Sequence, residues 1–138
     1  MLEFNLFLID YWYFSVPLFI FIFLFAYSEM NKGGKKIEPN ELTRLVNKES
    51  AILIDLRKKE DYENGHIMTA MNYPHQEFDN QMHELEKFKD RPIILVCDMG
   101  RNSANIGEKL KKAEFQETFR LNGGMMTWTQ ENLPVIQK

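Results

Sequence analysis

The chain falls into two parts by its pattern of hydrophobic and polar positions. The first part contains an unbroken run of 17 uncharged residues, Tyr11–Tyr27, and residues 6–9 extend the apolar character upstream of Asp10. A helix of 17 residues spans roughly 26 Å, which is close to the minimum length that crosses a bilayer. We therefore predict an amino-terminal tail over residues 1–10 and a transmembrane helix over residues 11–28.

A buried core helix and a cleavable signal peptide are the alternative interpretations of this run. A signal peptide opens with basic residues, whereas the residues before the run include Glu3 and Asp10 and no Lys or Arg. Behind the run lie Lys32, Lys35 and Lys36, which by the positive-inside rule place the carboxy-terminal side in the cytoplasm. We expect a single-pass protein of the cell inner membrane.

The second part of the chain alternates short apolar runs with amphipathic stretches. A polar segment with two adjacent glycines, residues 29–36, is predicted to be a flexible linker to a domain over residues 37–138. The predicted strands are residues 51–56, 92–96 and 117–121, with a further extended segment at 70–74. The predicted helices are residues 41–48, 58–64, 76–88, 102–113 and 125–133. Strands that alternate with helices favour an α/β fold, with a parallel sheet flanked by helices on both faces.

The candidate chemistry lies in ILVCDMGRNS, residues 94–103, where an apolar strand leads into a loop that begins with Cys97. A glycine-containing loop between a strand and a helix turns successive backbone N–H groups toward one point, and the helix dipole adds positive potential there. Such surroundings stabilise a thiolate, which is the nucleophilic form of cysteine. Cys97 is thus either an inert buried thiol or a reactive one, and the loop favours the reactive interpretation.

Composition narrows the classes of function. The chain has 138 residues, enough for one domain with a substantial core. From Gly33 onward, 16 Lys and Arg stand against 17 Asp and Glu, so bulk charge does not favour nucleic acid as a partner. One cysteine rules out an internal disulfide, and with three histidines it makes a cysteine-based zinc site improbable. No metal is expected.

Four stretches of the domain together resemble the rhodanese-like domain, in their order and spacing. They are ILIDLRKKEDYENGHI at 52–67, AMNYP at 70–74, ILVCDMGRNSA at 94–104 and LNGGMMTW at 121–128. With the amino-terminal anchor, the chain resembles bacterial membrane-anchored single-domain rhodanese-like proteins. The resemblance implies a five-stranded parallel sheet with Cys97 at the carboxyl end of a central strand.

The resemblance also implies sulfurtransferase activity, with sulfane sulfur carried as a persulfide on Cys97 and no separate cofactor. The donor would be a small molecule or a protein persulfide, and the acceptor a thiol or a protein. Backbone N–H groups of the loop would bind the persulfide, with the side chains of Arg101 and Ser103 as candidate contributors. The persulfide-binding loop comprises Asp98, Met99, Gly100, Arg101, Asn102 and Ser103. Supporting structural roles are expected for Asp55, Arg57 and His66.

Two features of the loop depart from the commonest family pattern. Asp98 stands where many members carry arginine, and Arg101-Asn102 stand where Asn-Arg is common. If it points inward, Asp98 would disfavour the thiolate and repel an anion such as thiosulfate. A phosphatase would need arginine six residues after Cys97, where this chain has Ser103. The alternative function is a non-catalytic, membrane-tethered adaptor that uses the fold for protein contacts.

Overall fold

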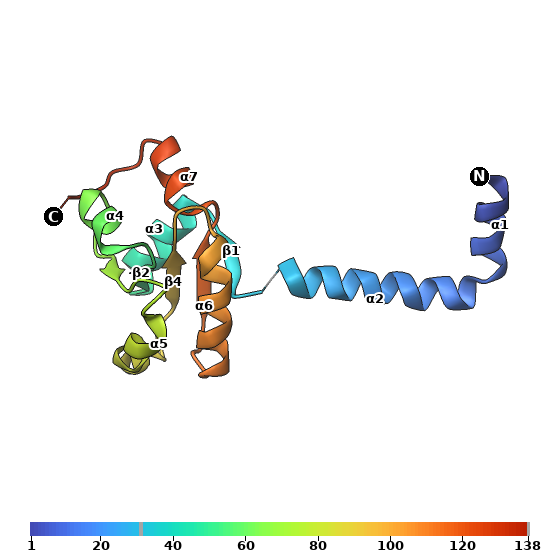
Figure 1. Ribbon diagram of the computed structural model, residues 1–138, viewed down its shortest axis with the longest axis horizontal. Helices are drawn as coiled ribbons and strands as arrows, with labels where there is room; N and C mark the ends of the chain where they lie inside the picture. Colours follow the sequence, from blue (N-terminus) through green and yellow to red (C-terminus); the bar gives the residue numbers. More distant parts are fainter. Residues whose placement is uncertain (31, 138) are drawn as a thin grey trace. The chain divides into compact units, whose positions relative to one another are not determined.

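The computed structural model describes residues 1–30 and 32–137, and the chain separates into two units that meet between Asn31 and Lys32. The first unit consists of two helices, α1 (Leu2–Asp10) and α2 (Trp12–Met30). The second unit is the α/β domain described below (Figure 1).

The amino-terminal unit has the apolar helix that the sequence predicts. Helix α2 has 19 residues, is long and apolar enough to span a membrane, and contains no buried residue. Residues 2–10, which we expected to be a tail, form helix α1 instead. Leucine and isoleucine recur through this stretch, and Tyr11 closes it by donating its backbone N–H to the carbonyl of Phe7 at 3.0 Å.

The domain is built on a parallel sheet of five strands, as expected. The strands are β1 (Lys35–Ile37), β2 (Ile52–Asp55), β3 (Met71–Asn72), β4 (Ile93–Val96) and β5 (Thr118–Leu121). Their order across the sheet is β1-β5-β4-β2-β3, so β4 is the central strand. All four residues of β4 are buried, in keeping with the continuous apolar run IILV.

Helices cover both faces of the sheet. They are α3 (Pro39–Lys48), α4 (Lys59–Asn64), α5 (Phe78–Gln81), the 3-10 helix η1 (Met82–Phe88), α6 (Arg101–Lys112) and α7 (Gly124–Gln130). The single helix expected over residues 76–88 is therefore divided into α5 and η1. Met82, Leu85 and Phe88 recur every three residues, and a 3-10 helix with three residues per turn places all three against the same core.

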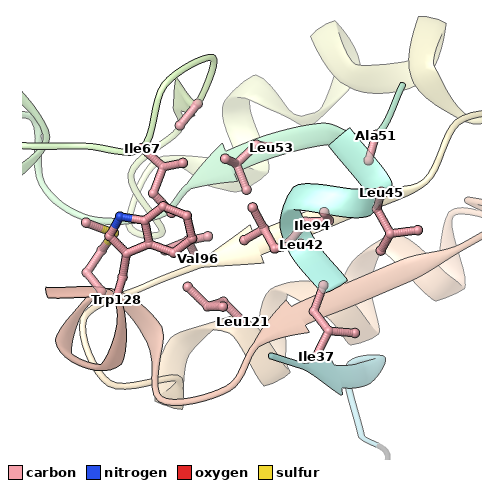
Figure 2. Close-up of a cluster of buried hydrophobic side chains, with 12 residues drawn as sticks. Ile37, Leu42, Leu45, Ala51, Leu53, Ile67, Ile94, Val96, Leu121 and Trp128 are labelled. Carbon is pink, nitrogen blue, oxygen red and sulfur yellow. The ribbon is translucent and has the colours of Figure 1, made fainter. Parts of the chain in front are cut away.

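Each face of the sheet has its own hydrophobic core. On one face, Leu42 and Leu45 of α3 and Trp128 of α7 pack against Ile94 and Val96 of β4 (Figure 2). On the other face, the side chains of α5, η1 and α6 enclose Ile93, Leu95 and Cys97. Alternate residues of the central strand thus point to opposite cores. Cys97 continues the alternation and faces α6.

The segment predicted to be a flexible linker is part of the folded domain, which corrects that prediction. The backbone N–H of Gly33 donates to Glu108 of α6 at 2.7 Å, and β1 pairs with β5 along residues 35–37. A Cβ atom on Gly33 or on Gly107 would overlap the backbone of the other segment, so the two segments pack with no room for a side chain. The glycines therefore serve close packing here, and the domain begins at Lys32 rather than at residue 37.

Candidate active site

Cys97 is the first residue after the central strand, at the carboxyl edge of the sheet. Its side chain is 2% exposed and belongs to the core beneath α6. In open parallel sheets this edge carries the ligand site, because loops from neighbouring strands converge there. The only cysteine of the chain therefore occupies the position in the fold that is best suited to chemistry.

The loop after Cys97 curls back on its sulfur. The backbone N–H of Gly100 donates to Cys97 Sγ at 2.9 Å, and the Ser103 hydroxyl donates to the Gly100 carbonyl at 3.0 Å. Gly100 has φ +86°, a left-handed conformation that glycine adopts without strain. The sulfur thus has a hydrogen-bond donor already in place, and Ser103, which is fully buried, stabilises the loop rather than contacting the sulfur.

Helix α7 supports the loop from behind. Met125 N–H donates to the Cys97 carbonyl at 2.7 Å, and Met126 N–H donates to the Asp98 carbonyl at 3.0 Å. Gly124, with φ +60°, makes this approach possible, because a Cβ atom there would overlap both carbonyl oxygens. The Gly123-Gly124 pair therefore fixes the position of the cysteine loop.

A buried ion pair shapes the neighbouring loop after β2. Arg57 Nη2 lies 2.9 Å from Asp55 Oδ2 and also donates to the Gly65 carbonyl at 2.6 Å. Asn72 donates its side-chain N–H to the carbonyls of Asp55 and Arg57, at 3.2 and 2.9 Å. With the Asp55 side chain only 1% exposed, the pair acts as a structural clamp. The two side chains pair as the sequence leads us to expect, and their supporting role in the site stays a prediction.

A cavity of about 190 Å³ opens beside Cys97, between its loop and the loop after β2. A cavity of this volume has room for a small molecule or the end of a side chain. The residues that line it are Leu56, Arg57, Lys58, Asp61, His75, Cys97, Asp98 and Asn102.

The predicted site residues divide into three groups. Asp98 and Asn102 line the cavity with Cys97, and Gly100 contacts the sulfur. Met99 is 48% exposed, and the side chain of Arg101 lies outside the part of the structure that is described. His66 is buried away from the cavity lining, where its ring stacks on Tyr62 at 3.8 Å and its Nδ1 lies 2.7 Å from the Tyr62 carbonyl.

Some residues near the cysteine are not predicted from the sequence. Lys58, Asp61 and His75 reach the cavity from segments far from it in sequence. Arg120, on β5, is a charged residue only 4% exposed. The sequence does contain one indication for Arg120, because it lies inside a predicted strand. An arginine that is buried in a strand normally has a specific partner. Among the residues that the structure describes, no cluster of three or more metal-ligating side chains occurs.

The fold and the cysteine loop define a class of protein. The family model for the rhodanese-like domain matches residues 38–131, which contain strands β2 to β5 and the cysteine loop but not β1. The chain therefore belongs to the rhodanese-like domain family.

Particular relatives sharpen this assignment. The chain is 35% identical over 123 residues to the uncharacterized protein YibN of Escherichia coli, covering 88% of this chain and 86% of that relative. It is 28% identical over 98 residues to thiosulfate sulfurtransferase GlpE of Shewanella oneidensis, covering 71% of this chain and 95% of the relative. The chain is therefore also similar to a protein that is named as a sulfurtransferase.

Solved structures support the fold. A rhodanese-related protein of Thermoplasma volcanium superposes with a TM-score of 0.68 at 23% identity, over 75% of this chain and 99% of the other. The polysulfide-sulfur transferase of Wolinella succinogenes superposes with a TM-score of 0.67 at 18% identity, over 87% of this chain and 90% of the other. At these identities the likeness concerns the fold.

Proposed function

We propose that the protein is a sulfurtransferase that carries sulfane sulfur as a persulfide on Cys97. The observation that carries the proposal is the hydrogen bond from Gly100 N–H to Cys97 Sγ, at the mouth of a cavity large enough for a small donor. A donor aimed at the sulfur stabilises negative charge there without reorganisation during the reaction. The family and the similarity to thiosulfate sulfurtransferase GlpE support the same reaction class.

The proposed reaction has two displacement steps at sulfur. The Cys97 thiolate attacks the sulfane sulfur of a donor; a new S–S bond forms to Cys97, and the donor's bond to that sulfur breaks with the electron pair leaving on the donor. A thiolate acceptor then attacks the outer sulfur of the persulfide and takes it, and Cys97 leaves as thiolate. The two steps need no external oxidant, reductant or cofactor.

The charge at the cavity bears on the identity of the donor. Asp98 lines the cavity and is exposed, so its carboxylate lies where a donor would approach. Thiosulfate is a dianion and is repelled by this carboxylate more strongly than a protein persulfide, which carries at most one negative charge on its sulfur. We favour protein persulfides or other less charged sulfane carriers as donors, and a thiol or protein as acceptor.

We further infer that α2 anchors the protein in the inner membrane, with the domain in the cytoplasm. Nineteen helical residues span about 28 Å, near the thickness of the hydrocarbon core. Lys32, Lys35 and Lys36 follow the helix and favour this orientation. Carbonate extraction of membranes should leave the full chain in the pellet, and protease added to intact spheroplasts should spare the domain. Recovery of a soluble chain shortened at its amino terminus would instead indicate a cleaved signal segment.

Intact-mass spectrometry of the full chain in detergent tests the sulfurtransferase proposal. Incubation with polysulfide, thiosulfate or a cysteine desulfurase and its substrate should add about 32 Da, and a reductant should remove it. Cys97→Ser should abolish the adduct, whereas Ser15→Ala in α2 should retain it. If none of the three donors gives an adduct, the alternative function as a non-catalytic adaptor is favoured. Asp98 is also compatible with that function.

A further inference from the structure

Arg120 is a buried cation that the proposed reaction does not yet use. It lies on β5, and its residue is only 4% exposed. Moving a guanidinium out of water is costly unless negative charge and hydrogen bonds compensate it. The surroundings of Arg120 therefore indicate which negative group it serves.

The sheet places Arg120 on the same face as the reactive sulfur. In the parallel pairing of β4 and β5, Arg120 lies opposite Leu95, two residues before Cys97. Side chains two residues apart on a strand point to the same face, and paired residues of neighbouring strands share that face. Leu95 and Cys97 both belong to the core beneath α6. The arginine side chain thus enters the layer that contains the cysteine.

One of the five N–H donors of the guanidinium has a described protein partner. Arg120 Nε donates to the Gly34 carbonyl at 3.2 Å, and neither Nη atom is among the described buried side-chain atoms that lack a partner. Burial lowers the pKa of Arg120, and negative charge on Cys97, followed by Glu108, opposes that effect. Glu108 is itself engaged, because it accepts from Gly33 N–H at 2.7 Å and lies 3.9 Å from Lys111 Nζ.

We propose that Arg120 is a positioning residue whose buried positive charge stabilises the anionic sulfur of Cys97, both as thiolate and as persulfide. The charge acts from β5, the strand beside β4, whereas Gly100 donates its backbone N–H directly to the sulfur. This inference deepens the proposed function and rests on Cys97 as the reactive group. It also makes Gly34, at the junction behind the amino-terminal helix, part of the support of the site, since its carbonyl orients Arg120.

Other charged groups near Cys97 set the background against which Arg120 acts. Arg57 is neutralised by Asp55, and the rest of the cavity lining carries charges of both signs at its exposed rim. Exposed charges are screened by water and salt, whereas a charge in the core is not. The described titratable groups that line the cavity with Cys97 are Arg57, Lys58, Asp61, His75 and Asp98, and Glu108 acts on Arg120.

The test is the pH dependence of Cys97 alkylation in the full chain, which holds no other cysteine. Iodoacetamide is neutral, so its rate reports the anionic sulfur without attraction to Arg120. Arg120→Gln keeps a hydrogen-bond donor and removes the charge; we expect an alkylation rate about tenfold lower at pH 7 and a half-maximal rate about one pH unit higher. Arg120→Lys, which keeps the charge, should restore most of the wild-type profile.

Lys36→Met is the matched control, because Lys36 pairs with Arg120 in the sheet register yet is exposed. It should leave the profile unchanged. A wild-type profile in Arg120→Gln would overturn the inference, as would equal losses in the Gln and Lys variants, which would indicate a packing role. If Arg120→Gln does not fold, the Glu108→Gln variant tests the inference instead. Glu108 competes with Cys97 for the positive charge of Arg120, so its removal should shift the pH profile of alkylation to lower pH. No shift would overturn the inference.

Alkylation does not require sulfur transfer, so the two proposals fail separately. A protein that forms no persulfide but shows the Arg120 effect would refute the sulfurtransferase and retain the electrostatic role. A protein that forms the persulfide but shows no Arg120 effect would retain the sulfurtransferase and refute the electrostatic role of Arg120.

Discussion

Cys97 and Asp98 are adjacent in the chain but differ in their surroundings. The cysteine is buried and receives a hydrogen bond from Gly100, whereas Asp98 is exposed at the cavity beside it. The backbone of Asp98 is held by Met126 N–H, so the residue is fixed near the sulfur even though its side chain is in water. Its charge therefore acts on whatever approaches Cys97.

Replacing Asp98 by Arg should raise kcat/KM for thiosulfate by about fivefold, because repulsion of the dianion is exchanged for attraction at a solvent-screened site. Steady-state turnover to cyanide at low ionic strength measures the change, and added salt should reduce it. Asp98→Asn should give an intermediate value. Asp90→Arg, an exposed position outside the cavity lining, should have no effect. Equal values for the position 98 and position 90 variants would contradict the assigned role of Asp98.

At the scale of elements, the short helix α7 determines the geometry of the cysteine loop. Its first two N–H groups after Gly124 hold the Cys97 and Asp98 carbonyls, and Gly124 itself approaches those oxygens too closely for any side chain. The loop is therefore held in shape by an element that lies almost 30 residues further along the chain. Reactivity at Cys97 depends on this contact as well as on the loop's own sequence.

Gly124→Ala should lower the free energy of unfolding by about 3 kcal/mol, because it adds a strained positive φ and a steric overlap with the loop. It should also slow persulfide formation. Thermal unfolding and intact-mass kinetics measure the two effects. Gly65→Ala is the control, since a Cβ there meets only Val135 at ordinary contact distance, 3.5 Å. Similar melting temperatures for the two variants would count against the support by α7.

The sequence predicts the elements whose pattern matches their environment. Buried parallel strands such as β4 appear as continuous apolar runs, and α6 shows its buried Ile106 and Leu110 at helical spacing. Strand β1 escapes prediction because two of its three residues are exposed lysines at the sheet edge. Its existence depends on pairing with β5, which is about 80 residues away, and no local pattern records that pairing.

The site shows the same limit. The loop chemistry of Cys97 and Gly100 can be inferred from adjacent residue types, and so can the Asp55–Arg57 pair. Arg120 and His75 come to Cys97 through sheet order and loop path, which are properties of the tertiary structure. Residues brought together by long-range pairing are the part of a site that local sequence describes least.

At the scale of the whole molecule, the domain includes the segment directly behind the amino-terminal helical unit. A chain beginning at Lys32 retains β1, the Gly33–Glu108 hydrogen bond and the Gly34–Arg120 hydrogen bond. A chain beginning at Glu38 loses all three, together with Ile37, which is 5% exposed.

We expect the chain beginning at Glu38 to be less stable than the one beginning at Lys32 by at least about 2 kcal/mol, the value of burying one isoleucine side chain. Urea unfolding followed by Trp128 fluorescence in the core measures the difference. The chain beginning at Lys32 should unfold at the same urea concentration as the domain of the full chain. Equal midpoints for the two shortened chains would show that β1 adds no stability.

Cys97 is the only cysteine of the chain, and this has a kinetic consequence under the proposed function. A persulfide on a protein with a second, resolving thiol can be discharged internally as a disulfide. Here no such intramolecular exit exists, so each sulfur leaves only when an acceptor reaches the cavity. The lifetime of the persulfide form is then set by the rate at which acceptors reach Cys97. Anchoring in a bilayer would confine these encounters to partners at the same membrane surface.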